Sequence, residues 1–217
     1  MFDIFTREGF LETLYFIPAL LLSLSIHEFG HSWVAYKLGD RSQKAMGRLT
    51  LSPFAHIDPL GFVFILLFKF GWGKPVYIDD RNFKNRAKGN MLVSLAGPVC
   101  NILLAILLTI VLKVLWIFGI NEQTITSSIG GILYYMLNIA IQFNMVFAVF
   151  NLLPIPPFDG SKVLYYFLPY KGKQFMNKLE RYSIWILIFL LWTGLYSYII
   201  LPAYIGVAFI INFILNL

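Results

Sequence analysis

The sequence is poor in charge and almost free of cysteine, and both shortages restrict the kind of protein it can be. Asp, Glu, Lys and Arg make up 13% of its 217 residues, about half the share in an average soluble domain. Hydrophobic residues make up 59%. This composition excludes a soluble fold and predicts a polytopic membrane protein. The single cysteine, Cys100, excludes an internal disulfide and any metal site built from several thiolates.

Long apolar runs indicate how the chain crosses the bilayer, because a spanning helix needs about 20 apolar residues. We expect spans over residues 10–36, 91–120, 132–150 and 183–217, the last as one or two helices. The apolar run 59–70 would reach only about 18 Å as a helix, so we expect it to be re-entrant. The polar stretch 71–90 has the Gly, Pro and β-branched content of a small β-hairpin or edge strand. The predicted fold is all-α, with about five or six transmembrane segments in a single domain over residues 1–217.

The basic residues predict an orientation. If the run 59–70 does not cross, residues 37–90 and 154–182 lie on one side of the membrane, and they hold 15 of the 17 Lys and Arg residues. The loop 119–130 holds none. Cytoplasmic loops carry the excess of positive charge, so we expect this side to face the cytoplasm from a cell membrane. The net charge of +6 therefore reflects orientation and lipid contact, and we expect no nucleic-acid partner.

The first predicted span contains the pattern His27-Glu28-x-x-His31 in an otherwise apolar helix. Residues i and i+4 lie on one face of a helix, so both imidazoles can reach one zinc ion. Glu28 lies about 100° round the helix from His27, where it can act as a general acid/base without binding the metal. The alternative is a chance match. Ionisable groups are costly inside a membrane span and mark functional sites there, which favours a zinc site.

A hydrolytic zinc site needs a third protein ligand and an open fourth position. The candidates are Asp159, His56, Asp58, Glu180 and Glu122. Glu122 falls on the opposite side of the membrane, and Glu180 is more simply a solvated ion pair in a basic loop. Asp159 follows a span in a Pro-rich stretch, and non-helical backbone at membrane depth lines a cavity or is buried in protein. Its alternative role is a turn or a helix N-cap, and Asp58 before Pro59 is most simply a helix start.

Five motifs together resemble a known family. "HEFGH", "SLAGPVCN" and "FNLLPIPPFDG", in this order, are similar to the site-2 protease family of intramembrane zinc metalloproteases, and "LSPFAHIDPLG" and "GWGKPV" are similar to its short prokaryotic branch. The resemblance covers about residues 20–165. It implies one Zn²⁺ per chain, bound by His27, His31 and Asp159, with Glu28 as the catalytic acid/base. The substrates it implies are transmembrane proteins, and we expect single-pass ones.

The resemblance also implies a role for Asn151, which would hydrogen-bond the substrate or the tetrahedral oxyanion. Capping a helix C-terminus is its alternative role. Many family members carry a PDZ module or a nucleotide-sensing domain, and we expect neither in this chain.

Other polar residues have less specific roles. His56 could gate the site, contact substrate or replace Asp159 as a ligand, against a structural hydrogen-bonded role. Asn101 is expected to support the metal site from behind its ligands, while the small residues around it favour close helix packing. We expect the stretch "GWGKPVYI", with Gly71, Gly73 and Val76, to pair as a strand edge with an unwound substrate. A plain connecting hairpin is the alternative.

A membrane metal carrier or scaffold using the same ligands is the competing function. A carrier needs polar residues along a path that reaches both faces of the membrane. Here the ionisable cluster stops near one face, and the opposite half of the spans is apolar apart from Lys113, which can snorkel. This pattern favours the protease.

Overall fold

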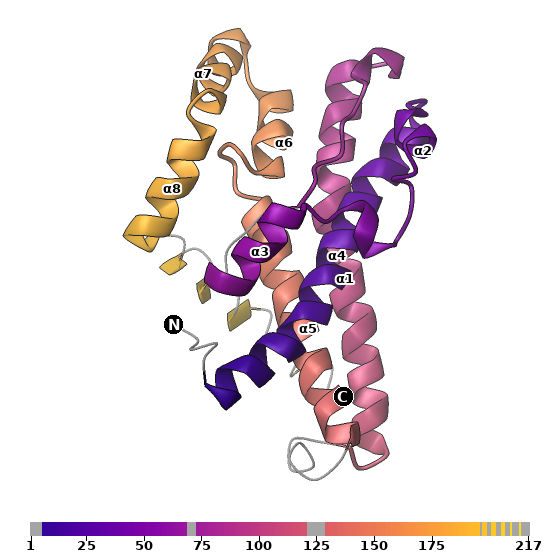
Figure 1. Cartoon of the computed structure of the whole chain (residues 1–217). Coiled ribbons are helices and arrows are strands. Elements are labelled where there is room, and N and C mark those ends of the chain that lie inside the picture. Colours follow the sequence, from indigo (N-terminus) through magenta and orange to yellow (C-terminus); the bar gives the residue numbers. More distant parts are fainter. Residues whose placement is uncertain are drawn as a thin grey trace.

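The computed structural model describes residues 6–68, 73–120 and 129–195, with isolated positions beyond residue 195. The regular elements of these residues are all helices (Figure 1). In chain order they are α1 (Arg7–Lys37), α2 (Ser42–Ala45), η1 (Pro53–Ala55), α3 (Pro59–Phe68), η2 (Asp80–Asn82), α4 (Arg86–Ile117), α5 (Ile129–Asn151), α6 (Asp159–Phe167), α7 (Tyr170–Glu180) and α8 (Ser183–Thr193).

Three helices, α1, α4 and α5, are long and apolar enough to cross a membrane. They pack against one another as a bundle (Figure 1), and each coincides with a predicted span apart from small shifts at its ends. The prediction of an all-α, multi-pass membrane protein is therefore confirmed. The total of five or six segments stays a prediction, because α3 and α8 are short and most of the chain beyond residue 195 lies outside the described residues.

Local sequence explains where the long helices begin. The Oγ1 atom of Thr6 accepts a hydrogen bond from the Gly9 N–H at 3.1 Å, and Oδ1 of Asn85 accepts one from the Lys88 N–H at 3.0 Å. Each side chain satisfies a backbone donor that has no partner within the first turn of its helix. The helix α8 ends at Gly194, whose φ of 69° lies in the left-handed region that glycine adopts readily.

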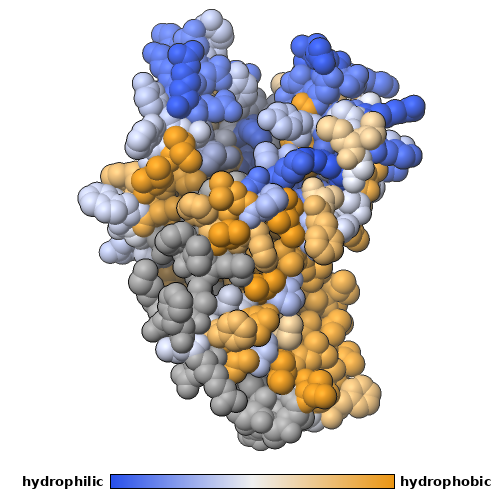
Figure 2. All heavy atoms as spheres, viewed as in Figure 1, coloured by the Kyte–Doolittle hydropathy of each residue, from blue (hydrophilic) through white to orange (hydrophobic). Residues whose placement is uncertain are grey.

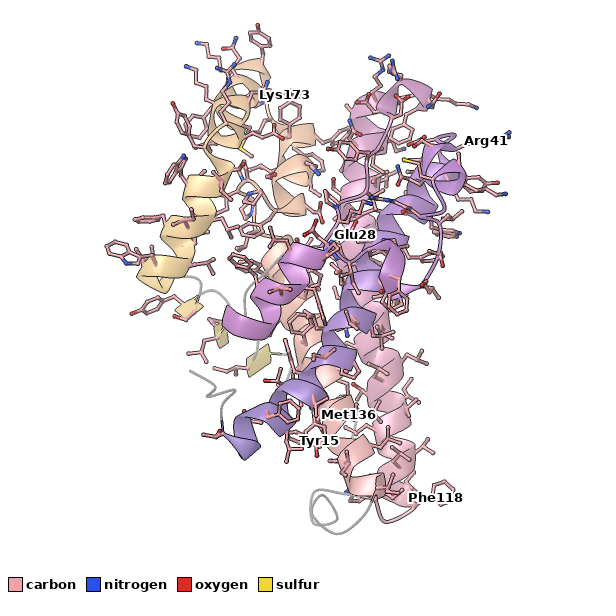
Figure 3. All side chains as sticks on the ribbon, viewed as in Figure 1. Tyr15, Glu28, Arg41, Phe118, Met136 and Lys173 are labelled. Atoms are coloured by element: carbon pink, nitrogen blue, oxygen red, sulfur yellow. The ribbon has the colours of Figure 1, made fainter. Side chains whose placement is uncertain are left out.

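The two ends of the molecule differ in polarity. Figure 2 shows hydrophilic side chains gathered at one end and hydrophobic side chains over the visible part of the rest. This polar end contains α2, α6 and α7, and Figure 3 shows Arg41 and Lys173 there, with Phe118 at the far end. On α4, the side chains of Leu103 and Leu107 are 59% and 56% exposed, as expected where a span faces lipid tails.

Two buried clusters hold the elements around the site. Ala105, Leu112, Tyr134 and Ile141 form the cluster between α4 and α5. At the polar end, Ala35, Phe83 and Val93 join α1, the chain after η2 and the first turns of α4. This second cluster fixes the start of α4 beside the part of α1 that carries the two histidines.

The prediction of a β-hairpin or edge strand within residues 71–90 is wrong for the part of that stretch that the structure describes. Residues 74–79 form no regular element, and the bridge recorded there is an isolated antiparallel one between Ile57 and Gly73. The physical reason is that, beyond Lys74, side chains and not a second strand bind the backbone of this segment.

Candidate metal centre

Two histidines of α1 and the first residue of α6 bring three ligand atoms together. His27 Nε2 lies 3.0 Å from His31 Nε2, and Asp159 Oδ2 lies 3.1 Å from each of them. All three residues are at most 9% exposed. Within the described ranges they form a group able to hold a metal ion, so the predicted set of two imidazoles and one carboxylate is assembled by the fold.

The Nδ1 atoms of both imidazoles already form hydrogen bonds. His31 Nδ1 lies 2.7 Å from the Val93 carbonyl oxygen, which can only accept, so this nitrogen donates. His27 Nδ1 likewise donates to Oδ1 of Asn101 at 2.7 Å. Each neutral ring then presents a lone pair at Nε2.

Two lone pairs and a carboxylate oxygen within 3.0–3.1 Å of one another repel unless a cation lies among them. Two imidazole nitrogens and one carboxylate are a donor set that zinc prefers, and orienting each ring through its other nitrogen is common in zinc sites. The residues present therefore fit a zinc ion.

The Asp159 carboxyl is held in its ionised form. Without a metal ion, a proton on His31 can take the place of the cation. Burial alone would raise the pKa of Asp159, but the charge of that protonated ring and the close contacts with both imidazoles outweigh burial and keep the pKa below its ordinary range. On its other oxygen, Asp159 Oδ1 lies 3.8 Å from Lys162 Nζ. The ionised carboxylate is the form that can ligate a metal.

A chain of buried amides supports the first histidine. Asn101 donates from Nδ2 to the Ser23 carbonyl at 3.0 Å and to Oδ1 of Asn144 at 2.7 Å, and Asn144 donates to the Ala140 carbonyl at 2.8 Å. Asn101, Asn144 and Ser23 are fully buried. These bonds link α1, α4 and α5, so the orientation of His27 depends on the packing of all three long helices.

Gly97 lets α4 approach the ligands closely. A Cβ atom at Gly97 would lie 2.6 Å from His31 Nε2 and 2.7 Å from His27 Nε2. Val93, Gly97 and Asn101 are spaced four residues apart, so they share the face of α4 that meets the histidines. The motif around Asn101 predicted close helix packing, but not the contacts of Val93 and Gly97 with the histidines. Their spacing places them on one face of a helix without indicating which helix that face meets.

Close backbone packing also places the third ligand. A Cβ atom at Gly160 would overlap the carbonyl oxygen of Leu152, so α6 starts directly against the chain that leaves α5. Asp159 lies one residue earlier, at the first position of α6. Its carboxylate contacts the histidines, which sets aside the alternative of a helix N-cap.

Glu28 follows His27 and faces the segment 73–79. Its Oε2 atom accepts a hydrogen bond from the Val76 N–H at 3.2 Å. In Figure 3, Glu28 lies nearer to Arg41 and Lys173 at the polar end than to Phe118 at the far end. The carboxylate therefore lies between the metal centre and this segment.

Three buried side chains from residues 40–48, which follow α1, bind the outer edge of this segment. We call these residues, Asp40, Gln43 and Arg48, the bracket. The bonds run from Gln43 to the Tyr77 carbonyl, from Arg48 to the Pro75 carbonyl, and from the Asp79 N–H to Asp40. The bracket residues are at most 9% exposed. They bind alternate residues, as a neighbouring strand would, so the backbone of Val76 and Ile78 is directed to the opposite, inner edge.

His56 and Asp58 lie outside the metal cluster. His56 is fully buried, with Nε2 2.9 Å from the Thr50 carbonyl, and its own carbonyl accepts from the Lys74 N–H at 2.8 Å. These contacts favour the structural role. Asp58 Oδ1 accepts from the Gly61 N–H at 2.8 Å and so caps the start of α3, as predicted.

The remaining predicted site residues are less directly connected to the cluster. Asn151 donates to the Phe147 carbonyl of its own helix at 3.0 Å, which resembles its alternative capping role. Gly73 packs closely, since a Cβ there would lie 2.9 Å from the Leu24 side chain. Gly71 lies outside the described residues.

Comparison with known proteins connects this geometry to a family. The chain matches the model of peptidase family M50 over residues 15–194. It is 38% identical over 188 residues to YwhC of Bacillus subtilis strain 168, a candidate zinc metalloprotease by name, covering 87% of this chain and 84% of that protein. No solved structure matches this chain significantly.

Two further relatives carry the same kind of name. Rip2 of Mycolicibacterium smegmatis is 32% identical over 184 residues, which cover 82% of this chain and 66% of that protein. MJ0611 of Methanocaldococcus jannaschii is 32% identical over 166 residues, which cover 74% of this chain and 75% of that protein.

The matched range includes the helices that supply the cluster and all three of its ligands. The family and the geometry agree on a zinc site inside a helical membrane protein. The chain therefore belongs to peptidase family M50, the site-2 protease family of intramembrane zinc metalloproteases.

Proposed function

We propose that this protease cuts single-pass membrane proteins near its polar end, which faces the cytoplasm, with Glu28 as the general acid/base. The observation that carries the proposal is the convergence of His27, His31 and Asp159 within 3.0–3.1 Å of one another, next to Glu28. These three residues would hold the zinc ion. A zinc ion in such a site supplies Lewis acidity, which acidifies a water molecule and polarises a carbonyl group.

Glu28 is suited to move the proton of hydrolysis. It adjoins His27 in the helix but is not one of the clustered ligands. A carboxylate in this position can accept the proton of the attacking water and deliver it to the leaving amine. Asn101 would keep the ring of His27 oriented meanwhile, and Asn151 stays a candidate for a hydrogen bond to the substrate.

The inner edge of the segment 73–79 is the proposed substrate-docking edge. A transmembrane helix hides its carbonyl groups in its own hydrogen bonds, so it must unwind before hydrolysis. The Val76 carbonyl and the backbone of Ile78 can offer replacement partners to an extended peptide. The Val76 N–H bonds to Glu28, so this edge adjoins the proposed acid/base. Gly73, without a side chain, would let the substrate backbone approach this edge closely. Gly71 stays a predicted substrate contact.

The orientation and the substrate class have separate support. The stretches 37–90 and 154–182 hold 15 of the 17 Lys and Arg residues, and their helices α2, α6 and α7 lie at the polar end (Figure 1). Loops with such an excess of positive charge lie in the cytoplasm. A single-pass helix has no bundle of its own to leave, so unwinding it costs only its own hydrogen bonds.

Purification in detergent, zinc quantification and cleavage of a single-pass model substrate test this function. We expect Glu28→Gln to retain wild-type zinc content while cleavage falls by about 10²–10⁴-fold, the usual size of a lost acid/base. His27→Ala should lose zinc as well as cleavage.

Glu12→Gln is the matched control, since it makes the same change in α1 away from the metal cluster. It should behave as wild type in both measurements. Wild-type cleavage by Glu28→Gln would remove Glu28 from the mechanism.

A further inference from the structure

A cavity of about 420 Å³ lies at the polar end, beside the metal centre. Its walls come from residues 76–78, Asp80, the first turns of α4 and α6, Pro156 and the last turns of α7. Val76, whose N–H contacts Glu28, and Val93, whose carbonyl contacts His31, belong to both the wall and the site. Figure 2 shows the polar end as two lobes with a hollow between them. The cavity therefore adjoins the place where the peptide bond would be cut.

Two carboxylates in this wall form no ion pair among the described residues, although the charge of Arg81 lies close to Asp80. Asp80 and Glu180 both line the cavity, and neither lies within ion-pair distance of a Lys, Arg or His among the residues that the structure describes. Asp80 is held in place by Asn90, which donates to its Oδ2 atom at 2.8 Å. The cation in the wall, Lys162, lies near Asp159 instead.

These carboxylates contrast with their surroundings. The loops of the polar end carry most of the positive charge of a chain whose net charge is +6, yet the cavity wall carries two acidic groups and one basic group. A wall of this kind suits a ligand that is itself positively charged.

We propose that this cavity binds the flank of the substrate that follows its membrane segment at the polar end, and that Asp80 and Glu180 select flanks carrying Lys or Arg. This inference rests on the proposed function. Membrane proteins concentrate Lys and Arg at the cytoplasmic ends of their spans, so a substrate cut near this end presents cationic side chains to the cavity. The volume lies within the range of about 300–1,000 Å³ that is typical of ligand pockets, enough for a short stretch of peptide.

The test compares three model substrates that share one transmembrane segment. The first carries two Lys residues in the flank at the polar end, the second carries them in the opposite flank, and the third has Gln at both places. Binding is measured with Glu28→Gln, which does not consume the substrate, and cleavage with the wild type. We expect the first substrate to bind about fivefold more tightly than the other two, as for partly exposed ion pairs.

Variants of the cavity separate charge recognition from structural damage. Asp80→Asn combined with Glu180→Gln should bring the binding ratio of the first and third substrates to about one. Asp80→Lys combined with Glu180→Lys should reverse the preference towards a substrate with Glu in the flank, and loss of structure cannot produce such a reversal. Raising the salt concentration should weaken both preferences.

Equal binding of the three substrates, or an unchanged preference in the neutralised double variant, would overturn the proposal. Because binding is measured separately from cleavage, a preference for the Lys flank in a chain that cuts nothing would support the cavity and contradict the proposed function. Normal cleavage without any preference among the substrates would support the proposed function and contradict the role of the cavity.

Discussion

At the scale of single residues, the metal centre depends on Gly97, which has no side chain, as much as on its ligands. The ligands could be predicted because the spacing of His27 and His31 is local, and a helix places i and i+4 on one face whatever surrounds it. Gly97 could not be recognised in this way. Its role is to leave space for two imidazole nitrogens that belong to another helix, and only the approach of α4 to α1 reveals that.

Gly97→Ala is expected to lower zinc affinity by at least about tenfold, comparable with the loss of a group that supports a ligand. The added methyl group would lie 2.6–2.7 Å from the Nε2 atoms of both histidines, so the rings must move. Zinc content after dialysis against a weak chelator measures this directly, without any substrate.

Gly130→Ala is the control, because its nearest neighbour is the end of the Ile120 side chain and it lies far from the ligands. We expect it to keep its zinc. Full zinc occupancy of Gly97→Ala under the same dialysis would show that the site can relax around the methyl group.

At the scale of elements, the helices followed from local patterns and the segment 73–79 did not. Apolar run length predicted α1, α4 and α5 closely. The composition of the segment predicted a strand, and that prediction was wrong, because side chains bind most of its backbone. Gln43 and Tyr77 are 34 positions apart, and a buried amide that replaces a neighbouring strand leaves no periodic pattern in the sequence.

The bracket is expected to position the docking edge. Gln43→Leu and Arg48→Met each remove a donor to the backbone of this segment, so kcat/KM should fall by about ten- to a hundredfold, the effect of a small misplacement of reacting groups. Zinc content should stay normal, because neither residue contacts the metal cluster. Amide hydrogen exchange of residues 76–79 should become faster.

Arg48→Lys keeps a cationic donor and should retain more activity than Arg48→Met. This ranking separates positioning from a general loss of stability, which thermal unfolding of each variant measures. Wild-type kcat/KM in both Gln43→Leu and Arg48→Met would show that the segment holds its place without the bracket.

At the scale of the whole molecule, the two ends should lie on opposite sides of the membrane. Arg41 is exposed at the polar end, and Phe118 is 77% exposed at the far end. In a Cys100→Ala background, which has no other cysteine, an impermeant maleimide applied to intact cells should label Phe118→Cys but not Arg41→Cys.

Permeabilised cells should label both positions, which controls for accessibility. Labelling of Arg41→Cys but not of Phe118→Cys in intact cells would invert the orientation and place the metal centre near the outer face.

The amino-acid pattern was sufficient for the class of protein, the three long spans and the zinc-binding pair of histidines. Each of these depends on composition or on near neighbours in the chain, through apolar run length and helical periodicity. Packing was needed for everything that joins distant parts of the chain. His27 and Asp159 are 132 positions apart, and their contact exists because glycines let α1, α4 and α6 approach closely. The bracket and the acidic cavity wall arise in the same way, since no local rule fixes which distant side chains meet.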